Sequence, residues 1–388
     1  MQPPRQILPV IILSQFCCTS LWFAGNAVSP ELISDFGLQN NLLGYLTSSV
    51  QLGFIGGTLL FAVYSITDRF SPSKVFFTCA ILGAAFNVAI IWGGHNFYSL
   101  LLFRFFTGFC LAGIYPVGMK IAADYFDKGL GKSLGFLVGA LVLGTALPHL
   151  LKFLSFGYSW QAVFMTTSLL AIIGGLLILL IVPDGPHRKR GVSSDWLACF
   201  KVFKIKPFRQ SAIGYFGHMW ELYAFWAFVP VILSIYQGLH QKVNFDISLL
   251  SFLIIAIGSV ACALGGVFSE RFGVKATATT FLFSSFSCCL LSPLMILYAP
   301  TSIFLLFLLV WGMVVIADSP LFSTLVAQNA EAKVKGAALT IVNSIGFAIT
   351  IVSIQSLSYA QQWMADQYIF LLLAVGPAVG LVFLKKSL

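Results

Sequence analysis

Two short stretches decide the fold, DRFSPSK at residues 68–74 and ERFGVK at residues 270–275. Each begins with an acid followed by Arg, and each comes directly after an apolar run of the length that crosses a membrane. The acid–Arg pair recurs about 200 positions later at the corresponding place among the apolar runs. Such self-similarity predicts a chain built from two related halves.

The composition places the chain in a membrane. Of its 388 residues, 59% are hydrophobic and 9% are charged, whereas about 25% of the residues of an ordinary soluble domain are charged. A transmembrane helix needs roughly 20 consecutive apolar residues, and the sequence supplies such runs throughout. We therefore expect an all-α polytopic membrane protein.

Twelve apolar spans are predicted, six in each half, with one long polar interruption between them. This organisation predicts an N-terminal half at 1–182, a cytoplasmic linker at 183–208 and a C-terminal half at 209–388. The predicted spans are 7–28, 42–66, 75–93, 99–122, 133–154, 161–182, 209–235, 248–267, 276–297, 302–326, 336–358 and 367–384.

The distribution of the positive charges indicates which loops are cytoplasmic. The formal net charge is +9, but most Lys and Arg lie in alternate connections between spans, which is the pattern of cytoplasmic loops. Both termini are therefore predicted to be cytoplasmic. This distribution explains the basic charge without a nucleic-acid partner, and we expect none.

Two further sets of matching positions support the repeat. The spacing of Gly108 and Pro116 in the fourth span recurs as Gly312 and Pro320 in the tenth, and residues 24–30 share two Ala and a Pro with residues 224–230. In transporters built from such repeats, one half rocks against the other about a site near the membrane midplane.

These motifs resemble those of the major facilitator superfamily, whose loop signature is roughly G-x-x-x-D-R-x-G-R-K. The second copy keeps Gly266, Glu270, Arg271, Gly273 and Lys275, and the first keeps Asp68, Arg69 and Lys74. Arg104 and Gly108 match the fourth-helix pattern R-x-x-x-G. The first copy departs from the signature, because Tyr64 and Ser71 stand where the family has Gly.

The stretches LWFAGNAVSPEL, LTSSVQLGF, GIYPVGMK and GTALPHLL are similar to bacterial members grouped with nitrate/nitrite and cyanate porters. The resemblance implies a transporter in the bacterial inner membrane that is no enzyme and uses no cofactor. Its expected partners are a small-molecule substrate, protons as coupling ion and the lipid bilayer, and we expect a monomer. The pairs Asp68–Arg69 and Glu270–Arg271 are predicted to act in gating.

Only two of the 13 acids, Glu221 and Asp318, lie well inside a span. A charged side chain at the membrane centre costs about 2.5–3.5 kcal/mol on insertion scales, so such residues suggest function. Glu221 is near mid-span, and His218 lies three residues earlier on the same helix face. We expect Glu221 to exchange a proton and His218 to relay it. The alternatives are a structural Glu that bridges helices, or a metal site, which would need further ligands and is not expected.

Other polar residues complete the predicted site. Arg104 either binds an anion or a coupling carboxylate, or extends its side chain to the headgroups. Asp318, two residues before Pro320, either belongs to the site or caps a broken helix, and His149 belongs either to the site or to the outer rim. The remaining candidates, whose aromatic members could instead face lipid, are Trp22, Asn26, Gln51, Tyr115, Tyr223, Trp226 and Asn343.

Taken together, the residues predict a secondary transporter that moves a small solute by alternating access. Proton coupling and a small organic anion as substrate are favoured by Arg104 and Glu221. An exporter of lipophilic compounds is the alternative within the class, and a membrane sensor or membrane-embedded enzyme is the alternative outside it.

Overall fold

The computed structural model describes residues 6–38, 42–126, 130–155, 159–188, 201–331 and 335–385. Every regular element in these ranges is an α-helix or a 3₁₀-helix. The chain divides into two compact units, Met1–Ser193 and Ser194–Leu388. The division falls inside the predicted linker 183–208, of which residues 189–200 lie outside the described part of the chain.

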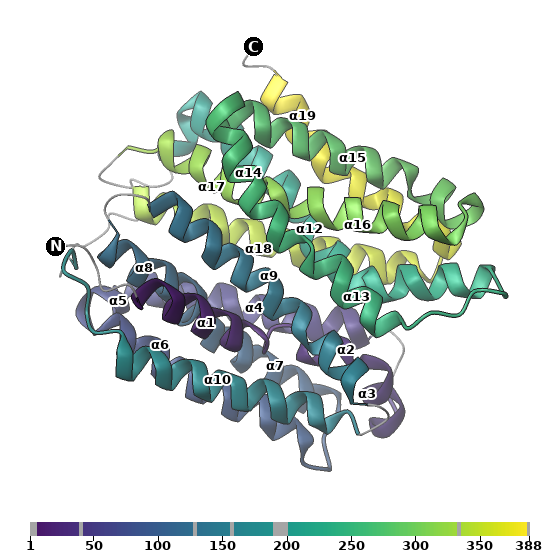
Figure 1. Ribbon diagram of the computed structural model, residues 1–388, viewed down its shortest axis with the longest axis horizontal. Helices are drawn as coiled ribbons and strands as arrows, with labels where there is room; N and C mark the ends of the chain where they lie inside the picture. The colour runs from purple at the N-terminus through teal and green to yellow at the C-terminus, as the bar shows by residue number, and fades with distance from the viewer. Residues whose placement is uncertain are drawn as a thin grey trace. The chain divides into compact units, whose positions relative to one another are not determined.

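The first unit contains the elements of spans one to six (Figure 1). Four of the six spans are interrupted or extended by a second short helix. In chain order the elements are α1 (Ile7–Thr19), α2 (Ala24–Ala27), α3 (Ser29–Phe36), α4 (Leu42–Val63), α5 (Ile66–Arg69), α6 (Pro72–Val88), η1 (Ala89–Ile91), α7 (Phe97–Ala112), α8 (Tyr115–Tyr125), α9 (Leu130–Leu154) and α10 (Gln161–Ile181).

The second unit repeats this arrangement with different interruptions. Its first long helix begins a few residues before the predicted boundary at 209. The elements are η2 (Val202–Lys204), α12 (Lys206–Leu239), α13 (Ile247–Ala256), α14 (Gly258–Phe272), α15 (Val274–Tyr298), α16 (Thr301–Ala317), α17 (Ser319–Gln328), α18 (Lys335–Ala360), η3 (Asp366–Ala374) and α19 (Val375–Lys385).

Among the described residues, 11 helical segments are long and apolar enough to cross a membrane. The first predicted span is not among these segments, because the helix expected over 7–28 is broken. Helix α1 ends at Thr19 after 13 residues, and helical structure resumes at Ala24. The prediction of an all-α polytopic membrane protein is confirmed, whereas the prediction of a continuous first helix is wrong.

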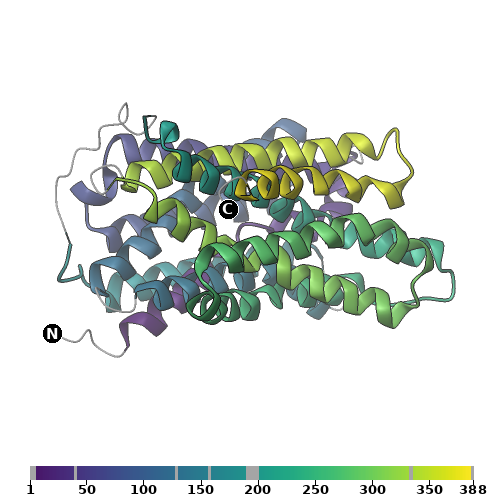
Figure 2. The same ribbon diagram turned by 90° about the horizontal axis from the view of Figure 1, so that it is seen from above.

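Corresponding helices have corresponding neighbours in the two units (Figures 1 and 2). In the first unit α4 packs against α7, α6 against α10, and α1 against α9 and α10. In the second, α13 and α14 pack against α16, α15 against η3 and α19, and α12 against α18 and α19. The weak sequence repeat is therefore expressed as one packing scheme used twice.

A glycine contact repeats at the level of single residues. A Cβ on Gly108 of α7 would lie 2.7 Å from the carbonyl carbon of Val50 of α4, and a Cβ on Gly312 of α16 would lie 3.1 Å from that of Ile254 of α13. Both partners are displaced along the chain by the same number of residues. Small residues at such positions let two membrane helices approach to backbone contact.

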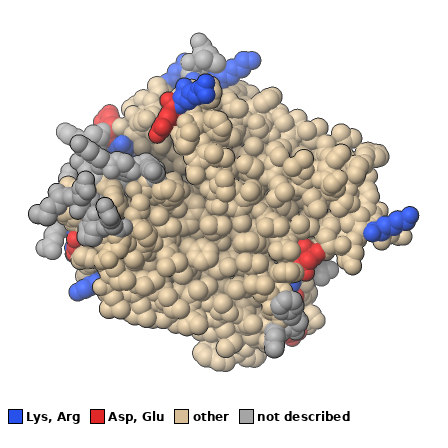
Figure 3. Space-filling view, in the orientation of Figure 1, with Lys and Arg blue, Asp and Glu red and all other residues tan. Residues whose placement is uncertain are grey.

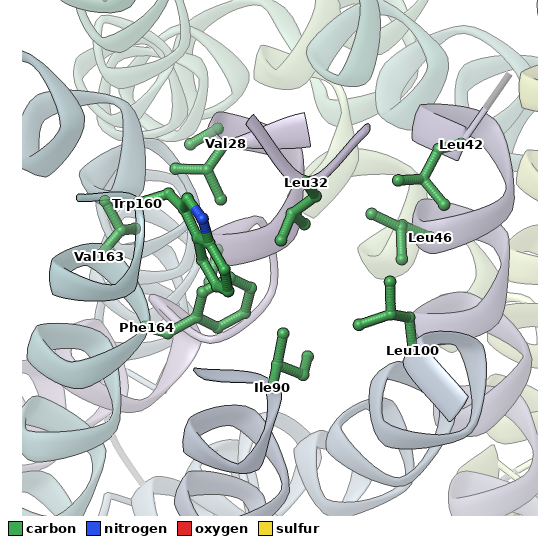
Figure 4. Close-up of a cluster of buried hydrophobic side chains, with 11 residues drawn as sticks. Val28, Leu32, Leu42, Leu46, Ile90, Leu100, Trp160, Val163 and Phe164 are labelled. Carbon is green, nitrogen blue, oxygen red and sulfur yellow. The ribbon is translucent and has the colours of Figure 1, made fainter. Parts of the chain in front are cut away.

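Apolar side chains fill the first unit and cover its surface. Near the break in the first span, Val28 and Leu32 pack with Trp160 and Phe164 in a cluster of buried side chains (Figure 4). On the face shown in Figure 3, Lys, Arg, Asp and Glu lie toward the margins and the broad middle is free of them. This distribution is the one expected of a surface that contacts lipid.

The glycine contact gives a stability prediction. We expect Gly108→Ala to lower the free energy of unfolding by about 1–3 kcal/mol, because the new methyl group overpacks the α4–α7 contact. The matched control is Gly56→Ala on α4, whose Cβ would meet its nearest atom at 4.0 Å. Thermal unfolding of both variants in detergent, followed by tryptophan fluorescence, tests this. Equal midpoints would show that the contact has room for a methyl group.

Candidate functional site

Arg104 lies at the break in the first span. Its side chain on α7 is fully buried, and Nη2 donates to the carbonyl oxygens of Leu21 at 3.1 Å and Trp22 at 2.5 Å. These two residues lie between α1 and α2, where the helix cannot satisfy its own carbonyls. Non-helical backbone at membrane depth requires such protein partners. The alternative that Arg104 extends to the headgroups is therefore wrong.

Asn87 is the other partner of Arg104, and the sequence reasoning missed it. Arg104 Nη1 donates to Asn87 Oδ1 at 3.0 Å, while Asn87 Nδ2 lies 3.1 Å from Thr167 Oγ1 and 3.0 Å from Ser168 Oγ. An amide in the middle of the apolar stretch AAFNVAI was the available signal. The network joins α6, α7 and α10 to the break in the first span.

No carboxylate balances this cation in the described part of the chain. The partners of Arg104 are an amide and two carbonyls, all of them neutral, and Nε has no hydrogen-bond partner. A Cβ on Gly25 would lie 3.5 Å from Nε, so the backbone of α2 passes close beside it. An unbalanced buried charge is costly and calls for a partner.

Three of the predicted polar residues lie close to one another in the first unit. Asn26 Nδ2 donates to Thr47 Oγ1 at 2.7 Å, and Gln51 lies one turn after Thr47 on the same face of α4. The Gln51 side chain is fully buried, and neither of its polar atoms has a hydrogen-bond partner among the described residues. Trp22 is buried against Phe54, with ring centroids 4.9 Å apart.

His149 and Tyr115 lie elsewhere in the same unit. His149 is buried on α9, and its Nε2 has no hydrogen-bond partner within the described ranges. Whether His149 belongs to the site or to the outer rim stays a prediction. Tyr115 opens α8 and is half-buried.

Glu221 joins three helices of the second unit. Its Oε1 accepts from Trp311 Nε1 at 2.6 Å and from Cys289 Sγ at 3.3 Å, and its Oε2 lies 2.7 Å from Ser285 Oγ. The side chain is 1% exposed. Sequence reasoning missed these partners, which come from α15 and α16. Through these partners, the carboxyl group of Glu221 links α12 to α15 and α16, as a structural bridge would.

His218 contacts Asp318, not Glu221. His218 Nδ1 lies 2.7 Å from Asp318 Oδ1, and both side chains are buried. Their second polar atoms, His218 Nε2 and Asp318 Oδ2, have no hydrogen-bond partner among the described residues. Asp318 lies between α16 and α17 and makes no side-chain cap. The capping alternative for Asp318 is therefore wrong.

Aromatic side chains surround the same helix. Tyr223 packs against Trp226 and Phe347, with ring centroids 5.3 Å and 5.2 Å apart. Tyr223 and Trp226 are buried, so the lipid-facing alternative is wrong for both, and Asn343 on α18 is half-buried. Within the described ranges, no three His, Cys, Asp or Glu side chains gather as metal ligands would.

The acid of the first acid–Arg pair, Asp68, lies in a cluster of polar side chains formed by α5 and α8. Asp68 of α5 forms an ion pair of 2.9 Å with Lys120 of α8, and Arg69 is exposed. In the second copy, Glu270 and Arg271 are exposed at the end of α14, with Arg271 5.3 Å from the centre of the Phe272 ring. A gating role for these four residues stays a prediction.

Residues 183–188 extend this cluster in the first unit. Tyr125 Oη donates to the carbonyl of Pro183 at 2.7 Å, and the His187 amide donates to that of Asp124 at 3.0 Å. Asp184 accepts from Ser71 Oγ at 2.6 Å and pairs with Arg188, which also donates to the carbonyl of Phe70. The start of the predicted linker is thus bound to the first unit.

Comparison with known proteins fixes the family. The family model described as Major Facilitator Superfamily matches residues 11–354. The chain belongs to this superfamily. Among curated relatives, the 4-hydroxybenzoate transporter PcaK of Acinetobacter baylyi is 23% identical over 167 residues, which are 40% of this chain and 34% of that protein. The chain thus spans about a third of the length of this relative.

Solved structures share the fold of this superfamily member. The human organic anion transporter TETRAN is similar with a TM-score of 0.75 and 16% identity, covering 99% of this chain and 100% of that one. The nucleoside transporter NupG is similar with a TM-score of 0.71 and 16% identity, covering 98% of both chains. All of these names are those of transporters, in agreement with the prediction that the chain is no enzyme.

Arg104 gives a second stability prediction. We expect Arg104→Ala to lower the free energy of unfolding by about 2–4 kcal/mol, since it leaves buried carbonyl and amide oxygens without their donor. Lys152→Ala is the matched control, because it removes a cation whose ion pair with Glu31 is partly exposed and is worth about 0–1 kcal/mol. Thermal unfolding measures both. If the two losses are alike, Arg104 does not hold the break.

Proposed function

We propose that this protein is a secondary transporter that carries a small organic anion together with a proton by alternating access. We place it in the bacterial inner membrane, as a monomer with both termini in the cytoplasm. Membership of the superfamily supports the transport of a solute. Arg104, a buried cation with only neutral partners, is the observation that carries the choice of an anion.

Arg104 lacks an anionic partner, and a carboxylate would supply one. A guanidinium offers a planar fork of N–H donors that matches a carboxylate and binds it more tightly than it binds neutral acceptors. Nε is the donor that has no partner. The names of the 4-hydroxybenzoate transporter and the organic anion transporter point to the same class of substrate.

Proton coupling rests on the second unit. Its buried titratable groups include His218 on α12 and Asp318 between α16 and α17. Intramembrane residues of this kind mark proton pathways. The sequence has no ATP-binding motif, so an ion gradient is the energy source we propose. Tyr223 and Trp226 have no assigned contact with the solute in this proposal.

Two other substrate classes remain to be tested against this one. A colistin resistance protein, EmrB of Acinetobacter baumannii, is 28% identical over 142 residues, which are 34% of this chain, and this favours the export of lipophilic compounds as the second candidate. The resemblance to nitrate/nitrite and cyanate porters stays a prediction, since the relatives found carry other names.

The test is uptake into proteoliposomes with radiolabelled 4-hydroxybenzoate as the probe. We expect an inward proton gradient to raise uptake, Arg104→Lys to reduce it about tenfold because the fork is lost, and Arg104→Ala to abolish it. Lys152→Ala should transport normally. Nitrate and tetraphenylphosphonium are the probes for the two other classes. Uptake of either one without 4-hydroxybenzoate, or normal uptake by Arg104→Ala, would refute the proposal.

A further inference from the structure

We propose that the buried His218–Asp318 pair holds the exchangeable proton and that Glu221 is a permanently protonated structural bridge. The role of the pair in transport rests on the proposed function. The assignment of the proton itself does not, because it follows from the contacts of the three side chains in the second unit.

Glu221 has all its hydrogen bonds satisfied in the protonated form. An indole N–H can only donate, so Trp311 requires Oε1 to accept. Ser285 Oγ donates to Oε2 at 2.7 Å, and it also lies 3.3 Å from the carbonyl oxygen of Leu282, to which it can donate instead when Oε2 carries a proton. A proton on Oε2 can therefore be donated to Ser285, whose own hydroxyl proton goes to Leu282.

A neutral Glu221 also needs no counter-ion. Among the described residues, no Lys or Arg contacts its carboxyl group, and the donors around it are an indole, a hydroxyl and a thiol. An ionised carboxylate in such a place would be a buried charge without compensation, which is costly. A neutral Glu221 can therefore bridge α12, α15 and α16 without burying a charge.

The His218–Asp318 pair has the opposite character, because its hydrogen-bonding capacity is not filled. Within the described ranges, His218 Nε2 and Asp318 Oδ2 are buried without a hydrogen-bond partner, and Asp318 Oδ1 has its contact with His218 Nδ1 alone. Unsatisfied buried polar atoms are rare and call for an explanation. Asp318 also lies at the interruption between α16 and α17, where no cap fixes its side chain.

The charge of the pair changes with one proton. With that proton, an imidazolium beside a carboxylate or an imidazole beside a carboxylic acid is neutral as a unit. When the proton passes to a water molecule, hydronium forms and the pair keeps one negative charge. The free Nε2 and carboxylate oxygens are then available to bind water, so proton release requires that water reach the pair.

Among the residues that the structure describes, the other titratable groups that face the pair carry no positive charge. They are Tyr215, whose ring centroid lies 6.0 Å from that of His218, Glu221 one turn away on α12, and Cys262 on α14. Cys262 Sγ lies 3.9 Å from the carbonyl of Ile316, close to the interruption. None of these groups compensates the negative charge, so its stability depends on access of water.

Infrared difference spectroscopy of the purified protein in nanodiscs tests the assignment without a substrate. We expect Asp318→Asn and His218→Gln to remove the pH-dependent carboxyl and imidazole bands. Glu221→Gln should remove a protonated-carboxyl band that does not change with pH. Trp311→Phe should shift that same band, and it provides a second test of Glu221 if Glu221→Gln fails to fold. Loss of the pH-dependent bands in Glu221→Gln, with their retention in Asp318→Asn, would overturn the assignment.

Transport then separates the assignment from the proposed function. With labelled 4-hydroxybenzoate, Asp318→Asn should keep exchange down the solute gradient and lose at least tenfold in accumulation driven by a pH gradient, whereas Glu221→Gln should keep both. If the wild type does not transport the probe, the proposed function fails while the infrared result still locates the proton. Normal accumulation by Asp318→Asn would overturn the role of the pair.

Discussion

The hydrogen bonds from Arg104 to the carbonyls of Leu21 and Trp22 are the constraint on which the first unit depends. In a membrane, a broken helix must find donors within the protein for the carbonyls that it frees. Arg104 supplies them from α7, and Asn87 holds the same guanidinium from α6. The break in the first span, the orientation of α2 and the position of the buried charge therefore depend on the same hydrogen bonds.

This constraint has a chemical cost. The guanidinium is fully buried, yet the groups that hold it in the described part of the chain are neutral. The second unit contains the buried carboxyl groups of Glu221 and Asp318, so the two units are unlike in charge although they are alike in packing. The packing scheme is carried by small residues such as Gly108 and Gly312, which leaves the polar positions free to differ.

The fold was largely predictable because each signal for it is local. Apolar runs predict spans, and the repeated acid–Arg motif predicts halves. The break after Thr19 was not predictable, since no Pro or Gly occurs at residues 19–24 and the stabilising donor is more than 80 residues away. Helical spacing placed His218 and Glu221 on one face, but it could not show that Asp318 pairs with the first and Trp311 with the second. Those partners are set by packing between helices.

The contacts of residues 183–188 change where the first unit ends. Its last transmembrane helix stops at Ile181, yet the residues that follow it hydrogen-bond to Tyr125, Asp124 and Ser71. The side chain of Arg188 also donates to the carbonyl oxygen of Phe70. A person dividing this chain into two co-expressed pieces would therefore cut after Arg188. A first piece that stopped at Val182 would leave Tyr125 Oη, Ser71 Oγ and the carbonyl oxygen of Phe70 without these partners.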